Sequence, residues 1–123
     1  MERQDEYVLR TVEERGVRFI RLWFTDVLGQ LKSFAITPAE LETALEDGMT
    51  FDGSAIEGFS RIQEADMLAC PDPATFEIVP WRGDDHPVAR VFCDVKHLSG
   101  EPFEGDPRHV LKRNLDRARE KGF

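Results

Sequence analysis

The chain has 123 residues, of which 41% are hydrophobic and 33% charged, and this length and composition suit one small folded domain. Its 24 acidic residues against 16 basic ones give a formal net charge of −8 at pH 7. Because phosphate backbones and anionic lipids repel an acidic domain, we expect no nucleic-acid partner and no membrane partner. The N-terminal residues show no apolar signal region, which predicts a cytoplasmic protein.

The first elements predicted along the chain are a helix and a β-hairpin. Apolar residues recur at helical spacing in 5–15, and Gly16 follows where a helix ends. Residues 17–25 carry β-branched and aromatic side chains on both faces, a pattern typical of a central strand. After a glycine-containing turn, residues 30–36 are predicted to form the second strand of the hairpin.

A second helix is predicted from a capping-box pattern. Thr37 has the properties of an N-cap, Pro38 suits the first helical position, and Glu40 stands where its side chain can reach back to the N-cap. Gly48 is expected to end this helix, whose narrow apolar stripe predicts that it lies on a sheet.

The remaining elements give the chain an α+β character. Residues 49–66 have few periodic apolar positions and are predicted to form an unusually long loop. Strands are predicted at 75–79 and 88–95, and Asp106 with Pro107 opens a final helix that runs to residue 121. We therefore expect an α+β fold in which about two helices pack on four strands.

Residue types alone predict no complete active site. Cys70 and Cys93 lack the spacing of a zinc site and the density of a disulfide framework, so we expect them to be small packing residues. The histidines are scattered, and no metal site is expected in this chain. The glycine loop of nucleotide-binding proteins, the GxSxG elbow and the HExxH motif are all absent from the sequence.

The segment 51–59 stands out within the predicted loop. Its apolar residues Phe51, Ile56 and Phe59 are suited to anchor it, whereas Asp52 and Glu57 are expected to project outward. On composition alone, a simple turn in which Asp52 accepts hydrogen bonds from neighbouring backbone N–H groups explains the same pattern.

Several motifs, in order along the chain, resemble the N-terminal domain of bacterial type I glutamine synthetase over essentially the whole length. They are the segment 18–26 with Gly29 and Lys32, the segment 51–59, and the segments 64–67, 71–75 and 106–108. The resemblance implies a β-grasp fold, in which a small curved mixed sheet cradles a helix. It also implies a β-grasp domain over residues 1–104, with residues 105–123 forming the first helix of a larger catalytic domain.

The resemblance further implies a function. Glutamine synthetases use ATP to join ammonia to L-glutamate through γ-glutamyl phosphate, in active sites formed between neighbouring subunits of stacked hexameric rings, a dodecamer. The ATP site, the magnesium or manganese ligands and most of the glutamate site belong to the larger domain. We therefore expect this chain alone to bind no cofactor and to have no ligase activity, while its loop over 52–66 is donated to the adjacent subunit's catalytic domain.

The site residues implied by the resemblance lie in that loop. Asp52 has the position of the aspartate that binds ammonium and removes its proton, and Ser54 matches the family pattern; both are expected to be catalytic. The other expected substrate-loop residues are Phe51, Gly53, Ala55, Ile56, Glu57, Gly58, Phe59 and Asp66.

Two alternatives stay open at this point. Ala55 replaces the second serine of the family's usual FDGSSI, and the family includes γ-glutamyl-polyamine and γ-glutamyl-amine ligases, so a larger amine could be the acceptor in place of ammonium. A stand-alone β-grasp module that binds another protein through a strand edge is the second alternative. The apolar stripe Leu111, Leu115 and Ala118 speaks against it, because the stripe is suited to pack against a larger body.

Overall fold

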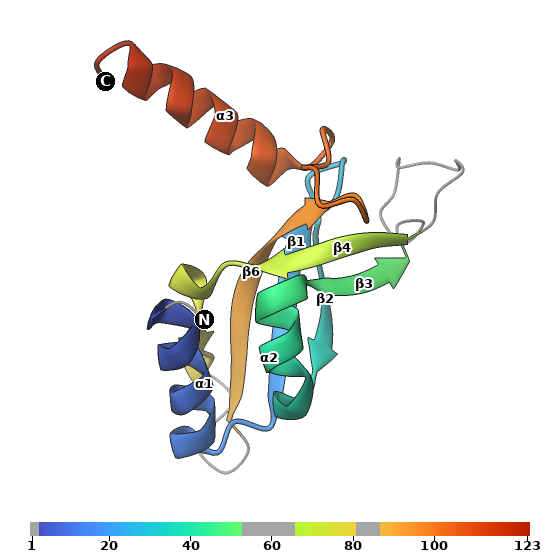
Figure 1. Ribbon diagram of the computed structural model, residues 1–123, viewed down its shortest axis with the longest axis vertical. Coiled ribbons are helices and arrows are strands. Elements are labelled where there is room, and N and C mark those ends of the chain that lie inside the picture. Colours follow the sequence, from blue (N-terminus) through green and yellow to red (C-terminus); the bar gives the residue numbers. More distant parts are fainter. Residues whose placement is uncertain (1–2, 53–65, 81–86) are drawn as a thin grey trace.

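The computed structural model describes residues 3–52, 66–80 and 87–123. Helices α1 (Arg3–Arg15) and α2 (Pro38–Asp47) lie side by side on one face of a curled sheet (Figure 1). A third helix, α3 (Pro107–Glu120), extends away from the sheet and is attached to it at its N-terminal end. No helix in these residues is long and apolar enough to cross a membrane.

The sheet is mixed and has the strand order β2-β1-β6-β4-β3, with β5 beside β6. Its strands are β1 (Phe19–Thr25), β2 (Leu31–Ile36), β3 (Met49–Asp52), β4 (Asp66–Pro71), β5 (Glu77–Ile78) and β6 (Val88–Lys96). The neighbours β1 and β6 run parallel, with Leu22 opposite Val91, whereas all other pairs are antiparallel. This architecture confirms the α+β class and the β-grasp fold expected from the sequence.

The main core lies between the sheet and the first two helices. Alternate residues of the central strands point into it, which is the period of two that a strand imposes. The buried core residues include Val8 and Val12 of α1, Ile20 and Leu22 of β1, Leu41 and Ala44 of α2, and Ala89, Val91 and Cys93 of β6. The prediction that β1 is central in the sheet is confirmed, although Phe19 on its opposite face is 50% exposed.

The predicted start of α2 is confirmed in detail. The backbone N–H of Thr37 donates to Oε1 of Glu40 at 2.9 Å, which supplies an acceptor to a backbone donor at the helix N-terminus. The helix ends at Gly48, whose φ of 80° is unfavourable for residues with a side chain. A Cβ atom at this glycine would lie 2.9 Å from Sγ of Cys70, so the glycine also allows close packing against β4.

Two predictions about the middle of the chain were wrong. The expected loop over 49–66 begins and ends with strands, because Met49–Asp52 and Asp66–Pro71 pair with each other as β3 and β4. The expected strand at 75–79 is reduced to Glu77–Ile78, because Pro73–Thr75 form a short 3₁₀ turn. Within the residues that the structure describes, the sheet therefore has six strands rather than four.

Candidate functional site

The ends of the predicted substrate loop lie at the loop end of the β3–β4 hairpin. Asp52 is the last residue of β3 and Asp66 the first of β4, and the two are direct partners in the antiparallel register. Both residues are exposed. The hairpin thus brings two carboxylate-bearing residues to neighbouring positions, whereas the candidates Gly53, Ser54, Ala55, Ile56, Glu57, Gly58 and Phe59 lie outside the described residues.

A cluster of aromatic rings supports the end of β3. The ring centroid of Phe51 lies 4.9 Å from that of Phe24 on β1 and 6.0 Å from that of Phe34 on β2. In the sheet order, β6 and β4 separate β1 from β3, so this contact depends on the curl of the sheet. The residue directly before Asp52 is therefore anchored in a packed environment, as the sequence indicated for Phe51.

The same region includes a second core cluster, made of buried Phe24, Met67 and Val95 with partly buried Phe34, Phe51 and Phe103 packed against them. Phe51 and Met67 are the neighbours of Asp52 and Asp66 on the strand side. Phe103 belongs to the segment that leads from β6 into α3. The second core cluster therefore joins both ends of the predicted loop to the junction with α3.

A buried carboxylate connects α3 to β6. Asp106 has no exposed surface, and its Oδ2 accepts a hydrogen bond from the backbone N–H of Val95 at 2.8 Å. Its Oδ1 accepts from the backbone N–H of Arg108 at 3.1 Å, which confirms the predicted N-cap. Burial raises the pKa of Asp106, and the two backbone donors oppose that rise by stabilising the charged form.

Arg108 connects the first turn of α3 to two further carboxylates. Its Nη2 donates to Oδ2 of Asp72 at 2.7 Å, and its Nη1 donates to Oδ1 of Asp94 at 2.8 Å. Lys112, one turn later, donates to both carboxylate oxygens of Asp94 at 2.9 Å. Although burial by itself would raise it, the pKa of Asp72 lies below its ordinary value because Arg108 and the backbone N–H of Ala74 donate to the carboxylate.

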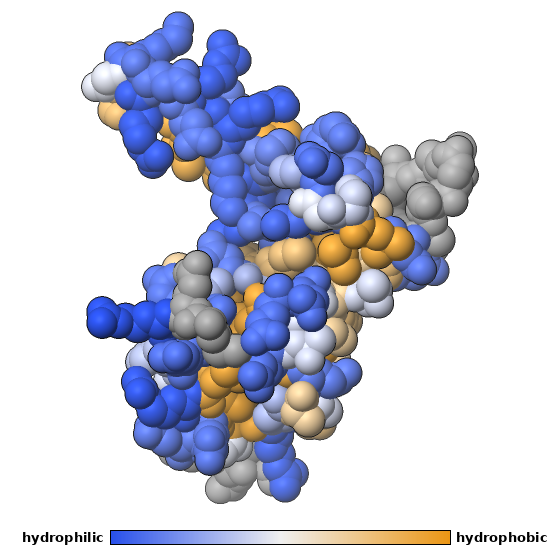
Figure 2. Space-filling model, viewed as in Figure 1, coloured by the Kyte–Doolittle hydropathy of each residue, from blue (hydrophilic) through white to orange (hydrophobic). Residues whose placement is uncertain are grey.

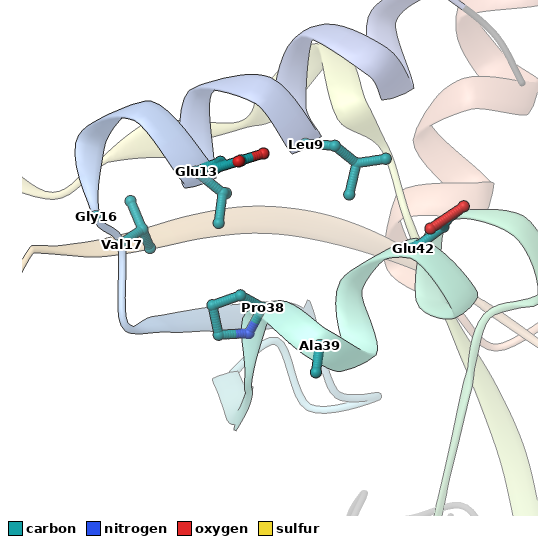
Figure 3. A pocket seen from close by; sticks show the side chains of 8 residues that line it. Leu9, Glu13, Gly16, Val17, Pro38, Ala39 and Glu42 are labelled. Atoms are coloured by element: carbon teal, nitrogen blue, oxygen red, sulfur yellow. The ribbon is translucent and has the colours of Figure 1, made fainter.

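A hollow of about 560 Å³ lies between α1 and α2, and none of the residues that line it among those described belongs to the predicted loop over 52–66. Figure 3 shows Leu9 and Val17 on one side, Pro38 and Ala39 on the other, and the carboxylate of Glu42 beside them. Figure 2 shows hydrophobic surface in this furrow and again over the outer end of β3 and β4. Among the described residues, the lining of the hollow combines apolar side chains with glutamates and includes no histidine, cysteine, serine or lysine, so these residues offer no nucleophile paired with a base.

Within residues 3–52, 66–80 and 87–123, no three side chains of histidine, cysteine, aspartate or glutamate lie close enough together to hold a metal ion. Cys93 is buried, and desolvation raises the pKa of its thiol, which keeps it protonated and unreactive. Among the described residues, the side chains best suited to bind charged groups are therefore the exposed carboxylates of Asp52 and Asp66 and the charged groups around Arg108.

Comparison with known proteins identifies the family. The family model for the glutamine synthetase β-grasp domain matches residues 16–98. The chain belongs to the glutamine synthetase family. This glutamine synthetase domain is 59% identical over 125 aligned residues to the enzyme of Mycobacterium bovis, a match that covers the whole chain and 28% of the relative. It is 52% identical over 118 residues to the enzyme of Methanosarcina mazei, covering 96% of the chain and 26% of the relative. The domain thus spans about a quarter of the length of these glutamine synthetases.

Solved structures agree with this assignment. The structure of a GmaS/ADP complex superposes with a TM-score of 0.82 at 32% identity, covering 93% of the chain and 26% of that protein. The glutamine synthetase of Plasmodium falciparum superposes with a TM-score of 0.85 at 22% identity, covering 99% of the chain and 23% of that protein, and shares the fold. Sequence reasoning identified the family and the cap at Asp106, but it missed the partners of Arg108, because Asp72 lies 36 residues away along the chain.

Proposed function

We propose that this chain is the N-terminal part of a glutamine synthetase, which forms L-glutamine from L-glutamate, ammonia and ATP. The observation that carries the proposal is the 59% identity to the Mycobacterium bovis enzyme, which extends over the whole chain. Because the chain spans 28% of that relative, we expect the ATP site and the magnesium or manganese ligands to lie in a further domain and the 123-residue chain alone to be inactive.

The proposed role of Asp52 follows from the chemistry of ammonium. At neutral pH ammonium carries four protons and has no lone pair with which to attack. A carboxylate balances its charge in a partly dehydrated site and accepts one proton, which leaves ammonia free to react. The nitrogen of ammonia then forms a bond to the γ-carbonyl carbon of γ-glutamyl phosphate, and the C–O bond to phosphate breaks. The surplus proton on the new amide nitrogen leaves with the released inorganic phosphate. Ser54, two residues beyond Asp52, offers a hydroxyl group to the same proposed site.

We further propose that the loop beginning at Asp52 is donated to the catalytic domain of an adjacent subunit and completes the active site there. Asp52 lies exposed at the loop end of a hairpin, while the residue before it packs against Phe24 and Phe34. A packed residue next to an exposed one suits a segment that binds another chain, because the packed residue fixes the position of the exposed residue.

A subunit-mixing experiment tests this proposal. The longer protein carrying Asp52→Asn is assembled together with subunits that are intact in this domain but inactivated in the catalytic domain. Each parent is expected to form glutamine at least about 100-fold more slowly than the unaltered enzyme, whereas mixed oligomers recover activity because some interfaces then pair an intact loop with an intact catalytic domain. Failure of verified mixed oligomers to recover any activity would contradict donation between subunits.

Ala55 makes a larger amine the second candidate acceptor, because a hydroxyl group usual in the family is missing there. The longer protein is assayed with glutamate and ATP and with ammonium, methylamine, ethylamine or a polyamine as the acceptor. We expect the highest kcat/KM with ammonium. A higher kcat/KM with one of the larger amines would assign the chain to a γ-glutamyl-amine ligase instead.

A further inference from the structure

Within the described residues of this chain, helix α3 lacks the packing that normally fixes the direction of a helix. None of its residues is buried, and its apolar residues Val110, Leu111 and Leu115 are 36%, 59% and 52% exposed. Figure 1 shows its body extending from the sheet, with contact confined to its N-terminal end. Its direction must therefore be determined by the few contacts of its first two turns.

The cap at Asp106 supplies one point of attachment. Its buried carboxylate ties the helix start to the backbone of Val95 on β6. A single attachment point holds the helix end in place, but the helix axis can still swing about it. Further contacts at other positions are needed to select one direction.

Arg108 supplies these contacts in two directions at once. One arm of its guanidinium reaches Asp72 after β4, and the other reaches Asp94 on β6. The Arg108 side chain is 24% exposed, and those of Asp72 and Asp94 are 28% and 24% exposed, so all three are partly shielded from solvent. Ion pairs in such surroundings are screened less by salt than exposed ones. Lys112 adds a contact to Asp94 one turn further along the helix.

The geometry of the guanidinium is essential to this arrangement. It is planar and presents several N–H donors in a fixed fork, so that it can hold two carboxylates simultaneously. A lysine ammonium at the same position would act as a single point charge. The two acidic partners come from different segments of the domain, which prevents α3 from turning toward one of them without breaking its contact with the other.

We propose that Arg108 fixes the direction in which α3 leaves the sheet. Arg108 is thereby a positioning residue, because the direction of α3 sets the place of the following domain relative to Asp52. The direction of α3 concerns the 123-residue chain alone. The placement of the following domain rests on the proposed function, because it requires a catalytic domain beyond α3.

Residual dipolar couplings of backbone N–H groups directly test whether Arg108 fixes the direction of α3. In the unaltered chain, α3 and the strands should fit one common alignment frame. In Arg108→Gln, we expect the couplings of α3 to fall below the values that the alignment frame of the strands requires for a fixed helix. Arg113→Gln removes the same charge from an exposed position of the same helix and is expected to leave α3 aligned. Couplings in R108Q that match those of R113Q would overturn the proposal.

Two milder variants keep the test decisive if R108Q fails to fold. Arg108→Lys keeps the charge but loses the fork, and Asp72→Asn weakens one arm while Asp94 stays paired with Lys112. Each is expected to reduce the α3 couplings less than R108Q. Unchanged α3 couplings in both of these folded variants would also overturn the proposal.

Kinetics of the longer enzyme test whether Arg108 positions the following domain relative to Asp52. We expect R108Q to lower kcat for glutamine formation while the KM for ATP stays unchanged, with R113Q as the control. An unchanged kcat in an enzyme whose α3 couplings have decreased would overturn the positioning role. Failure of the proposed function is recognised separately, because the unaltered longer enzyme would then form no glutamine, while the couplings of R108Q would still report on α3.

Discussion

Replacing Asp106 by alanine is expected to melt α3 while the sheet stays folded. The substitution removes the N-cap of the helix, which contributes about 1 kcal/mol. It also leaves the buried backbone N–H of Val95 without its acceptor, at a cost of about 1–3 kcal/mol as long as α3 stays docked. The combined loss is about 2–4 kcal/mol.

This loss falls on an element that has little stability of its own. Helix α3 has 14 residues and none of them is buried, so hydrophobic burial contributes little to it. An isolated helix of this length is marginal in water. A loss of about 2 kcal/mol changes an equilibrium constant by up to about 30-fold, which is enough to make the unfolded form of α3 dominant.

Circular dichroism and NMR measure the effect separately in α3 and in the sheet. We expect Asp106→Ala to lower the helical signal at 222 nm in the absence of denaturant and to give random-coil chemical shifts for 107–120, while the strand shifts hardly change. Asp106→Ser retains a capping hydroxyl but cannot reach Val95 equally well, so it should be intermediate. Helical shifts in α3 of the alanine variant equal to those of the unaltered chain would refute the reasoning.

Three further changes test the packing and the charges described above. Burial would raise the pKa of Asp72, but the hydrogen bond from Arg108 lowers this pKa overall in the folded chain. The charged carboxylate therefore stabilises the fold fully at pH values above the unfolded pKa of about 3.9. This contribution is lost as the pH falls through the lower pKa of the folded state. Asp72→Asn should therefore cost about 1–2 kcal/mol at pH 7 in urea unfolding and make stability less sensitive to acid; an unchanged acid dependence would contradict this. Gly48→Ala should cost about 1–3 kcal/mol, because φ is 80° there and the new Cβ would lie 2.9 Å from Sγ of Cys70; equal urea midpoints would show that the position tolerates a side chain. Phe24→Ala should cost about 3–5 kcal/mol, since the residue is 5% exposed and belongs to the second core cluster; a loss below about 1 kcal/mol would argue against that cluster.

Local patterns predicted the elements whose signals lie within a few residues of each other. The capping box at Thr37 and Glu40, the cap at Asp106 and the alternation along 88–95 each reflect short-range geometry, and the structure contains all three. The strands β3 and β4 were missed because Met49–Asp52 is only 4 residues long and Pro71 at the end of β4 suggested a break. Their strand character comes from pairing with each other and with β6, which no short window of sequence contains.

The candidate site divides in the same way. The resemblance placed Asp52 in the site, and the structure adds that its strand neighbour Phe51 packs against rings from β1 and β2. The contacts of Arg108 could not be predicted, because the pairing of β4 with β6 brings Asp72 and Asp94 together from separate segments.

The most direct test of the account is the turnover of the longer enzyme with Asp52→Asn, measured as ATP-dependent formation of glutamine from glutamate and ammonium. Asp47→Asn is the matched control, because it makes the same chemical change at an exposed position at the end of α2. We expect the Asp52 variant to lose at least about 100-fold in kcat with ATP binding retained, as for removal of a group that transfers a proton, and the Asp47 variant to keep full turnover. A kcat of the Asp52 variant equal to that of the control would contradict the central claim that this domain supplies Asp52 to the reaction.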